Sequence, residues 1–260
     1  MEELSKEQEI LKKYLQAISE NLSSCIMSLN LFKTISFISE DIQKSSFGYS
    51  LFAIQRLAIN DIILSLSKIF EETKESINLK KIERYICAEQ RQLALLNDSI
   101  SSLEKYTLFD FSTLENYHKE IDTKRNGFSY KIEYEAFELL PFLTCLQKGV
   151  KKIYLEYEHD IQALKDIRDK TIAHSDKRPI DKKTTWDKVD ILIQFLEHYV
   201  DMMDSIFFNT CCSGDGCVPY SSIRSDATKP SSNLLRLLEK ASVINGKNKE
   251  DTIRKLSTSI

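Results

Sequence analysis

The sequence LFAIQRLAINDIILSLSKIF occupies residues 51–70 and is the most apolar run of the chain. Its apolar residues recur at the spacing of an α-helix, which predicts a helix over about 47–72 that is buried on most sides. Arg56, Asn60 and Asp61 are unusual in such a helix. They form either a solvated edge or a satisfied internal pair. The alternative is that Arg56 and Asn60, one turn apart, support a nearby active centre.

Residues that break helices are scarce along the rest of the chain. The 260 residues include 6 Gly and 4 Pro, and no Pro precedes Pro141. Strands joined by tight turns need Gly and Asn-Gly corners, so this composition favours an all-α fold. Hydrophobic residues make up 42% of the chain, which is enough for a sizeable core. Further helices are expected over about 4–44, 78–97, 101–123, 142–173 and 184–209.

The composition changes near Thr210, where Cys-Cys-Ser-Gly-Asp-Gly-Cys begins and Pro219 and Pro230 follow. Clusters of Gly, Ser and Pro are typical of connecting segments. We therefore expect a helical domain over 1–209 and a linker or mobile loop over 210–232. Residues 233–260 are expected to form a short helix and a polar tail.

Charge and cysteine usage limit the binding partners and the cellular location that we expect. The net charge of −3 argues against a wholly electrostatic nucleic-acid binder but leaves room for a local basic site. Six scattered cysteines and no signal peptide after Met1 favour reduced thiols and a cytoplasmic location. Because charged residues interrupt residues 51–70, no membrane partner is expected.

The candidate chemistry lies in Arg168-Asp169-Lys170-Thr171-Ile172-Ala173-His174. An arginine carries a permanent planar charge that matches phosphate oxygens, and a histidine can move a proton near neutral pH. On a straight α-helix six residues turn through roughly 240°, so Arg168 and His174 would lie on different faces. They converge only if the helix ends around Ala173, or if two protomers share one cleft across a two-fold axis.

A basic segment follows His174 and could track an RNA backbone, although most charged loops are only solvated. It contains Lys177, Arg178, Lys182 and Lys183, with Lys188 just beyond. A structural alternative also exists for the motif itself: His174 caps a helix and Arg168 pairs with Asp166 or Asp169.

No metal site or cofactor is expected. Cys211, Cys212 and Cys217 offer three thiolates, but structural zinc commonly takes four ligands and no fourth lies close by. The role of these cysteines stays open. The chain also has no Gly-rich phosphate loop, nucleophile elbow or His-Glu-x-x-His motif.

The motif at 168–174 resembles the Arg, polar residue, spacers and His pattern of the HEPN superfamily. Residues 52–66 also resemble the early core helix of abortive-infection (Abi) type HEPN proteins. The resemblance implies an antiparallel helical bundle with extra helices and a short C-terminal tail. It implies a homodimer that cleaves single-stranded RNA without metal, in phage defence or as a toxin.

The resemblance implies that His174 is the general base or acid and that Arg168 stabilises charge on the phosphorus oxygens. Asp169 would orient one of these two side chains. Some members of the superfamily carry a Tyr two residues after the His, where this chain has Asp176. Regulation through that Tyr is therefore not expected here. Asp176 either pairs with His174 or repels substrate phosphate, which weighs against efficient cleavage.

Two other functions fit the same sequence. One is a non-catalytic HEPN-like module that binds nucleotide, RNA or protein, with Arg168 as an anion anchor. The other is a toxin held silent by an antitoxin or a defence-system partner.

Overall fold

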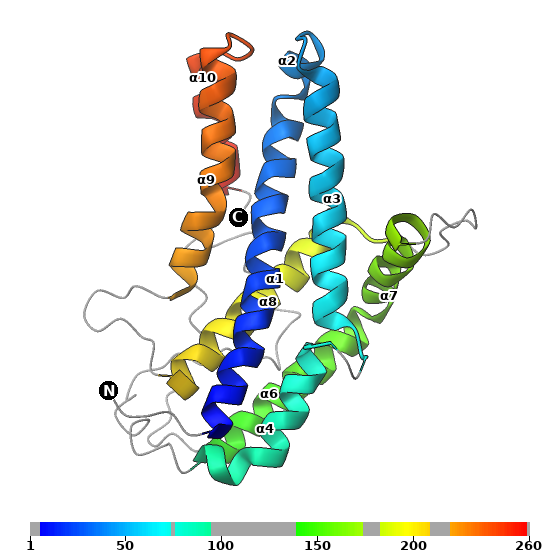
Figure 1. Cartoon of the computed structure of the whole chain (residues 1–260), viewed down its shortest axis with the longest axis vertical. Coiled ribbons are helices and arrows are strands. Elements are labelled where there is room, and N and C mark those ends of the chain that lie inside the picture. The colour runs from blue at the N-terminus through cyan, green and yellow to red at the C-terminus, as the bar shows by residue number, and fades with distance from the viewer. Residues whose placement is uncertain (1–5, 74–75, 95–138, 174–182, 209–218, 259–260) are drawn as a thin grey trace.

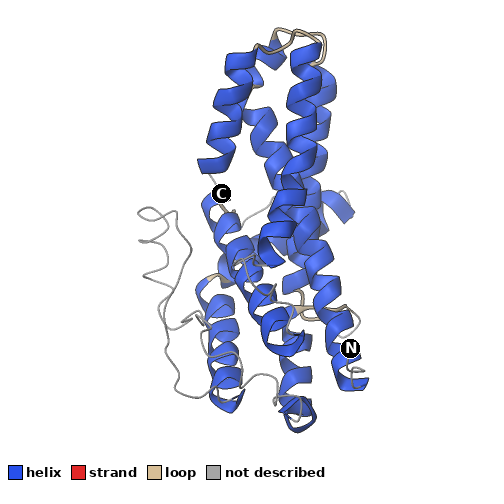
Figure 2. Ribbon diagram, turned by 90° about the vertical axis from the view of Figure 1, so that its left-hand side faces the viewer, coloured by secondary structure: helices blue, strands red, loops and turns tan. Residues whose placement is uncertain are grey.

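The computed structural model describes residues 6–73, 76–94, 139–173, 183–208 and 219–258, which are helical without any strand (Figure 2). This confirms the all-α prediction. The helices in chain order are α1 (Lys6–Phe37), α2 (Ser39–Gln43), α3 (Gly48–Phe70), α4 (Leu79–Ala94), α6 (Leu139–Glu156), α7 (Glu158–Ile167), the π-helix η3 (Arg168–Ala173), α8 (Trp186–Phe208), α9 (Pro219–Lys240) and α10 (Gly246–Thr258).

The long helices α1 and α3 lie side by side in opposite directions, with the short α2 at the turn between them (Figure 1). Along α1 the predicted apolar stripe is buried, because residues three and four apart share one face of a helix. This stripe comprises Leu11, Leu15, Ile18, Leu22, Ile26 and Leu29. The other helices pack around this pair, so it forms the centre of the bundle.

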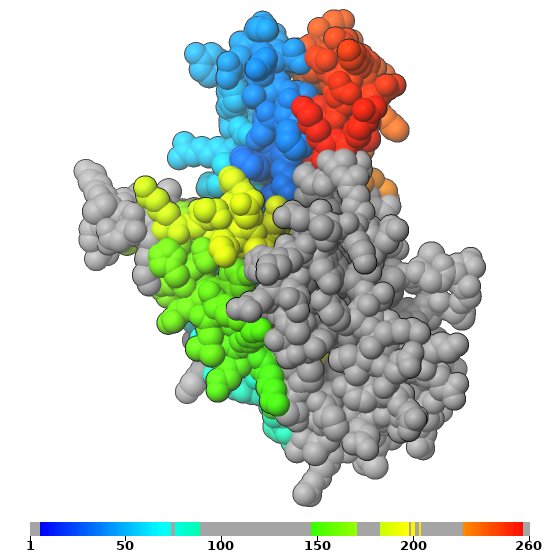
Figure 3. All heavy atoms as spheres, turned by 180° about the vertical axis from the view of Figure 1, so that it is seen from behind, coloured from blue at the N-terminus to red at the C-terminus, as the bar shows by residue number. Residues whose placement is uncertain are grey.

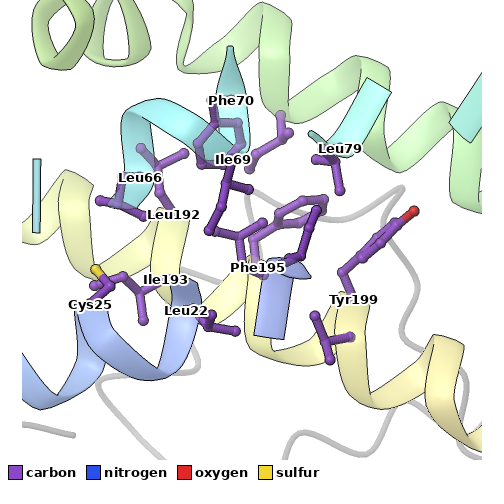
Figure 4. Packing of buried hydrophobic residues seen from close by; sticks show 14 of the residues in the cluster. Leu22, Cys25, Leu66, Ile69, Phe70, Leu79, Leu192, Ile193, Phe195 and Tyr199 are labelled. Atoms are coloured by element: carbon purple, nitrogen blue, oxygen red, sulfur yellow. The ribbon is translucent and has the colours of Figure 1, made fainter. Parts of the chain in front are cut away.

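The main core forms where α1 and the second half of α3 meet α4, α6, α7, α8 and α9. Figure 4 shows its centre, which is filled by Leu22, Cys25, Leu66, Ile69, Phe70, Leu79, Leu192, Ile193, Phe195 and Tyr199. A smaller cluster lies at the other end of the hairpin and joins α9 and the turn after it to α1, α2 and α3. It comprises Ile35, Ile38, Ile42, Leu51, Leu235, Leu238 and Ile244.

The first half of α3 is more exposed than its sequence predicts. Tyr49 and Leu57 are 96% and 66% exposed, so burial on most sides holds only for the second half of the helix. Asp61 is a satisfied internal residue, because its Oδ2 accepts hydrogen bonds from the hydroxyls of Ser24 and Ser28 at 2.8 and 2.7 Å.

By length and composition alone, α3 is the one helix in the described ranges that could cross a membrane. Core helices of globular proteins pass the same test, and the second half of α3 lies in the core of this bundle. The expectation that no membrane is involved stays a prediction.

The single helix expected over 142–173 is divided into α6, α7 and η3. The break between α6 and α7 lies at Tyr157, whose backbone angles of φ −110° and ψ 19° are outside the helical range. The Tyr157 ring is itself buried in the main core. The helix is therefore interrupted at a residue that packing holds in place.

The C-terminal part also differs from the prediction. Residues 219–232, expected to belong to a linker, form the first half of α9, and α10 replaces the expected polar tail. Ala227 packs into the main core, and its carbonyl accepts a hydrogen bond from Asn30 at 3.4 Å. Burial against α1 thus compensates for low helix propensity and for Pro230 inside the helix. Residues 210–218 and the helix expected over 101–123 lie outside the described residues, and the division into domain, linker and tail stays a prediction.

One buried and one exposed leucine of α3 test the packing of this helix in the main core. We expect Leu66→Ala, which opens a cavity in the main core, to lower the free energy of unfolding by about 2–5 kcal/mol. Leu57→Ala, on the exposed face, should stay within about 0.5 kcal/mol of the wild type. Trp186 is the only tryptophan of the chain, so urea unfolding can be followed by its fluorescence. Equal losses for both variants would contradict this packing.

A second prediction concerns the thiol of Cys25. Burial raises its pKa well above the ordinary value, and the negative charges of Asp61, Glu197 and Asp190 act in the same direction. Because the thiolate is the reactive form, iodoacetamide at pH 8 should modify Cys25 about a hundredfold more slowly in the native chain than in urea. Peptide mass spectrometry measures both rates, and equal rates would show that this part of α1 is open to solvent.

Candidate functional site

Arg168 stands at the point where the backbone leaves α-helical geometry. Its N–H lies within hydrogen-bonding reach of the carbonyls of Leu164 and Lys165 at the end of α7. The six residues from Arg168 to Ala173 then form the π-helix η3. Such i→i+5 turns are rare and frequently occur at functional sites. The angular spacing of a straight α-helix therefore does not apply to Arg168–Ala173.

The guanidinium of Arg168 contacts two carboxylates from different elements. Its Nε donates to Oδ1 of Asp169 at 2.8 Å, within η3. Its Nη1 lies 3.1 Å from Oε2 of Glu71, the residue that ends α3. The side chains of Arg168 and Glu71 are 16% and 23% exposed, whereas that of Asp169 is 54% exposed. The cation is thus held in a half-buried position between α3 and η3.

Glu71 is held in turn by the packing at the end of α3. The preceding residue, Phe70, is fully buried, and its carbonyl accepts a hydrogen bond from the Tyr154 hydroxyl at 3.3 Å. The Phe70 and Tyr154 rings meet edge to face with centroids 5.7 Å apart. Lys80 lies over the Tyr154 ring and pairs with Glu72 at 2.5 Å. The backbone that carries Glu71 is therefore anchored to both α4 and α6.

The carboxylates keep Arg168 charged. The hydrogen bond with Asp169 raises the pKa of Arg168, and the hydrogen bond and charge of Glu71 act in the same direction against the opposing effect of burial. An arginine is already charged at every pH at which proteins fold. A pH dependence of activity in the neutral range must therefore come from another group.

Sequence reasoning missed Glu71, and no signal in the sequence could have found it, because Glu71 and Arg168 are brought together only by tertiary packing. The structural alternative for Arg168 is observed in part. Asp169 pairs with it as that alternative expects, but Asp166 instead accepts a hydrogen bond from Gln162 at 2.8 Å.

The other predicted site residues are placed as follows. Arg56 is exposed and Asn60 is partly buried on α3, roughly 22 and 16 Å along the helix from Glu71 by the rise per residue. Neither is an ion-pair partner of Arg168 in the described part of the chain. Lys183 is exposed. His174, Asp176, Lys177, Arg178 and Lys182 lie outside the described residues, so the Arg168–His174 pairing and the RNA contacts stay predictions.

The chain re-enters the described structure beside α7. Thr184 donates to Asp160 of α7 at 2.9 Å, and Lys188 lies 5.1 Å from the ring of Tyr157. Burial raises the pKa of Tyr157 to about 12, so its hydroxyl keeps its proton near neutral pH.

The start of α8 also contacts α1. The rings of Trp186 and Phe32 lie with their centroids 4.4 Å apart, and Nζ of Lys33 lies 3.1 Å from Oδ2 of Asp190. From behind, the start of α8 is seen between α7 and α1 (Figure 3). The described residues that precede and follow 174–182 therefore belong to one bundle.

No group of three or more His, Cys, Asp or Glu side chains that could hold a metal ion occurs in the described ranges. Cys211, Cys212 and Cys217 lie outside them. The expectation of no metal and no cofactor stays a prediction.

Comparison with known proteins gives one match. The sequence model of a HEPN-type family described as AbiU2 matches residues 9–229, which is most of the chain. This match agrees with the resemblance inferred from the motif and the early core helix. No curated protein and no solved structure matches.

The pair between Glu71 and Arg168 can be measured with a double-mutant cycle. We expect the variants Glu71→Ala, Arg168→Ala and the double variant to give a coupling of about 1 kcal/mol in urea unfolding, because the half-buried pair is partly shielded from solvent. Glu72 is the matched control, since it pairs with Lys80 instead. A coupling of Arg168 to Glu72 as large as its coupling to Glu71 would contradict the observed pairing.

Proposed function

This chain belongs to the AbiU2 family of HEPN-type abortive-infection proteins, and from that membership we propose that it is a metal-independent endoribonuclease. Its substrate in this proposal is single-stranded RNA. Arg168 and His174 carry the reaction at a cleft between two copies of the chain. The setting is phage defence or toxin action in the cytoplasm.

The reaction uses the nucleophile that RNA itself supplies. The ribose 2′-oxygen attacks the adjacent phosphorus, its proton goes to a base, and the bond from phosphorus to the 5′-oxygen breaks as that oxygen gains a proton. His174 acts as the base or as the acid. Arg168 stabilises the negative charge that builds on the non-bridging oxygens. The products are a 2′,3′-cyclic phosphate and a 5′-hydroxyl.

The observation that carries the proposal is the fixed guanidinium at the start of η3. It is half buried, it is held from two elements, and it comes six residues before His174 on a π-turn. A preorganised cation of this kind stabilises transition-state charge without having to reorganise during the reaction. Asp169 is proposed to orient Arg168, which agrees with the 2.8 Å hydrogen bond between them.

Arg56 and Asn60 are retained in the proposal as supporting residues on α3, and Lys177, Arg178, Lys182 and Lys183 as contacts to the RNA backbone. A homodimer lets each copy contribute one Arg168 and one His174 to a shared groove. An antitoxin or another defence protein is the proposed partner that restrains the activity.

A second candidate is a non-catalytic module that binds RNA, nucleotide or a partner protein. It is favoured by the same pairing, because two carboxylates already compensate the charge of Arg168. An arginine with this role would anchor an anion or stabilise the fold without taking part in a reaction.

The discriminating experiment incubates the purified full chain with single-stranded RNA in the presence of EDTA. We expect cleavage to persist and to leave 2′,3′-cyclic phosphate ends, which mass spectrometry identifies. Arg168→Ala and His174→Ala should each reduce the rate by about a hundredfold or more. An oligonucleotide with 2′-deoxy sugars should remain intact because it lacks the nucleophile.

Two exposed residues serve as matched controls for these substitutions. Arg236→Ala on α9 and His159→Ala on α7 should cleave at the wild-type rate. Intact RNA with retained binding would favour the non-catalytic module. Cleavage that EDTA abolishes would rule out the metal-independent mechanism.

A further inference from the structure

We propose that the Glu71 carboxylate competes with the RNA phosphate for the Arg168 guanidinium and holds that guanidinium in position while the site is empty. This inference rests on the proposed function of Arg168 as a phosphate-binding group. It makes Glu71, which lies at the end of a different helix, a positioning residue of the same site.

Two nitrogens of the Arg168 guanidinium already face carboxylates. Asp169 contacts Nε and Glu71 contacts Nη1. A phosphate that binds two nitrogens in the bidentate mode must then use Nη1 and Nη2, since Nε is taken. Its oxygen would approach the nitrogen that already faces Glu71, and the two anions repel each other. Binding of RNA therefore weakens or displaces the contact with Glu71.

The two carboxylates differ in how they are held. Asp169 neighbours Arg168 in η3, is largely exposed, and moves with it. Glu71 comes from α3, and its backbone follows the buried, hydrogen-bonded Phe70. Of the two partners, only Glu71 can hold the guanidinium relative to the rest of the bundle.

The charges around Arg168 do not cancel. One guanidinium faces two carboxylates, so these three groups together carry an excess negative charge. Replacing the Glu71 carboxylate by a neutral amide removes that excess but keeps an oxygen that can accept from Nη1. Replacing it by a methyl group removes both. The two substitutions therefore separate competition from positioning.

The experiment compares Glu71→Gln and Glu71→Ala with the wild type in two measurements. The first is the affinity for a 2′-O-methyl oligonucleotide, which cannot be cleaved, by fluorescence anisotropy. Both variants should bind it about three- to tenfold more tightly at low salt, and the difference should shrink at high salt. The second is single-turnover cleavage of RNA. Glu71→Ala should be about tenfold slower, and Glu71→Gln should stay within about threefold of the wild type.

Glu72→Gln is the matched control, because Glu72 is the adjacent carboxylate and pairs with Lys80. It should change neither affinity nor rate. Urea unfolding of every variant shows that each is folded. A merely structural role for Glu71 would lower stability, affinity and rate together, and Gln would not restore the rate.

The outcomes separate this inference from the proposed function. Variants of Glu71 that bind as the wild type does, or more weakly, overturn the inference whether or not RNA is cleaved. If the Glu71 variants bind RNA more tightly but neither they nor the wild type cleave it, the nuclease proposal is refuted. The competition between carboxylate and phosphate is then still supported. If the wild type binds no RNA, the inference and the proposed function fail together.

Discussion

The packing of α1 against the second half of α3 is the contact on which the rest of the structure depends. The two helices place their apolar stripes face to face, and α4, α6, α7, α8 and α9 complete the core around them. Inside this contact the Asp61 carboxylate is paired with the hydroxyls of Ser24 and Ser28. A paired carboxylate between two helices favours one register, because a shift of either helix would leave the half-buried group without a partner.

The end of α3 connects this core to the candidate site. Phe70 is the last fully buried residue of the helix, and Glu71 follows in an extended conformation. The side chain of Glu71 reaches the guanidinium of Arg168, where α7 gives way to a π-turn. Core packing thus determines where a carboxylate lies, and the carboxylate determines where the cation lies. The charge of Arg168 is therefore already compensated within the chain by two carboxylates, those of Glu71 and Asp169.

Most helices were predictable, because their apolar residues repeat with the helical period and few Gly or Pro interrupt them. The exceptions have a physical cause. Tyr157 divides an apparently continuous helix because its ring enters the core. Residues 219–232 are Ser- and Pro-rich and suggested a linker, yet they form a helix because Ala227 is buried against α1. Local propensity is weak compared with burial, so the sequence misleads wherever the two disagree.

The sequence by itself determined the all-α class, the stripes that form the core and the HEPN-type family, whereas the role of Arg168 stays a prediction. These depend on residues close together in the chain, whose spacing is the physical signal. Only the tertiary structure decided that α3 is exposed along its first half, that α7 ends in a π-turn, and that Glu71 is the partner of Arg168. Ion pairs between distant segments depend on how the helices pack, and the spacing of neighbouring residues does not determine that packing.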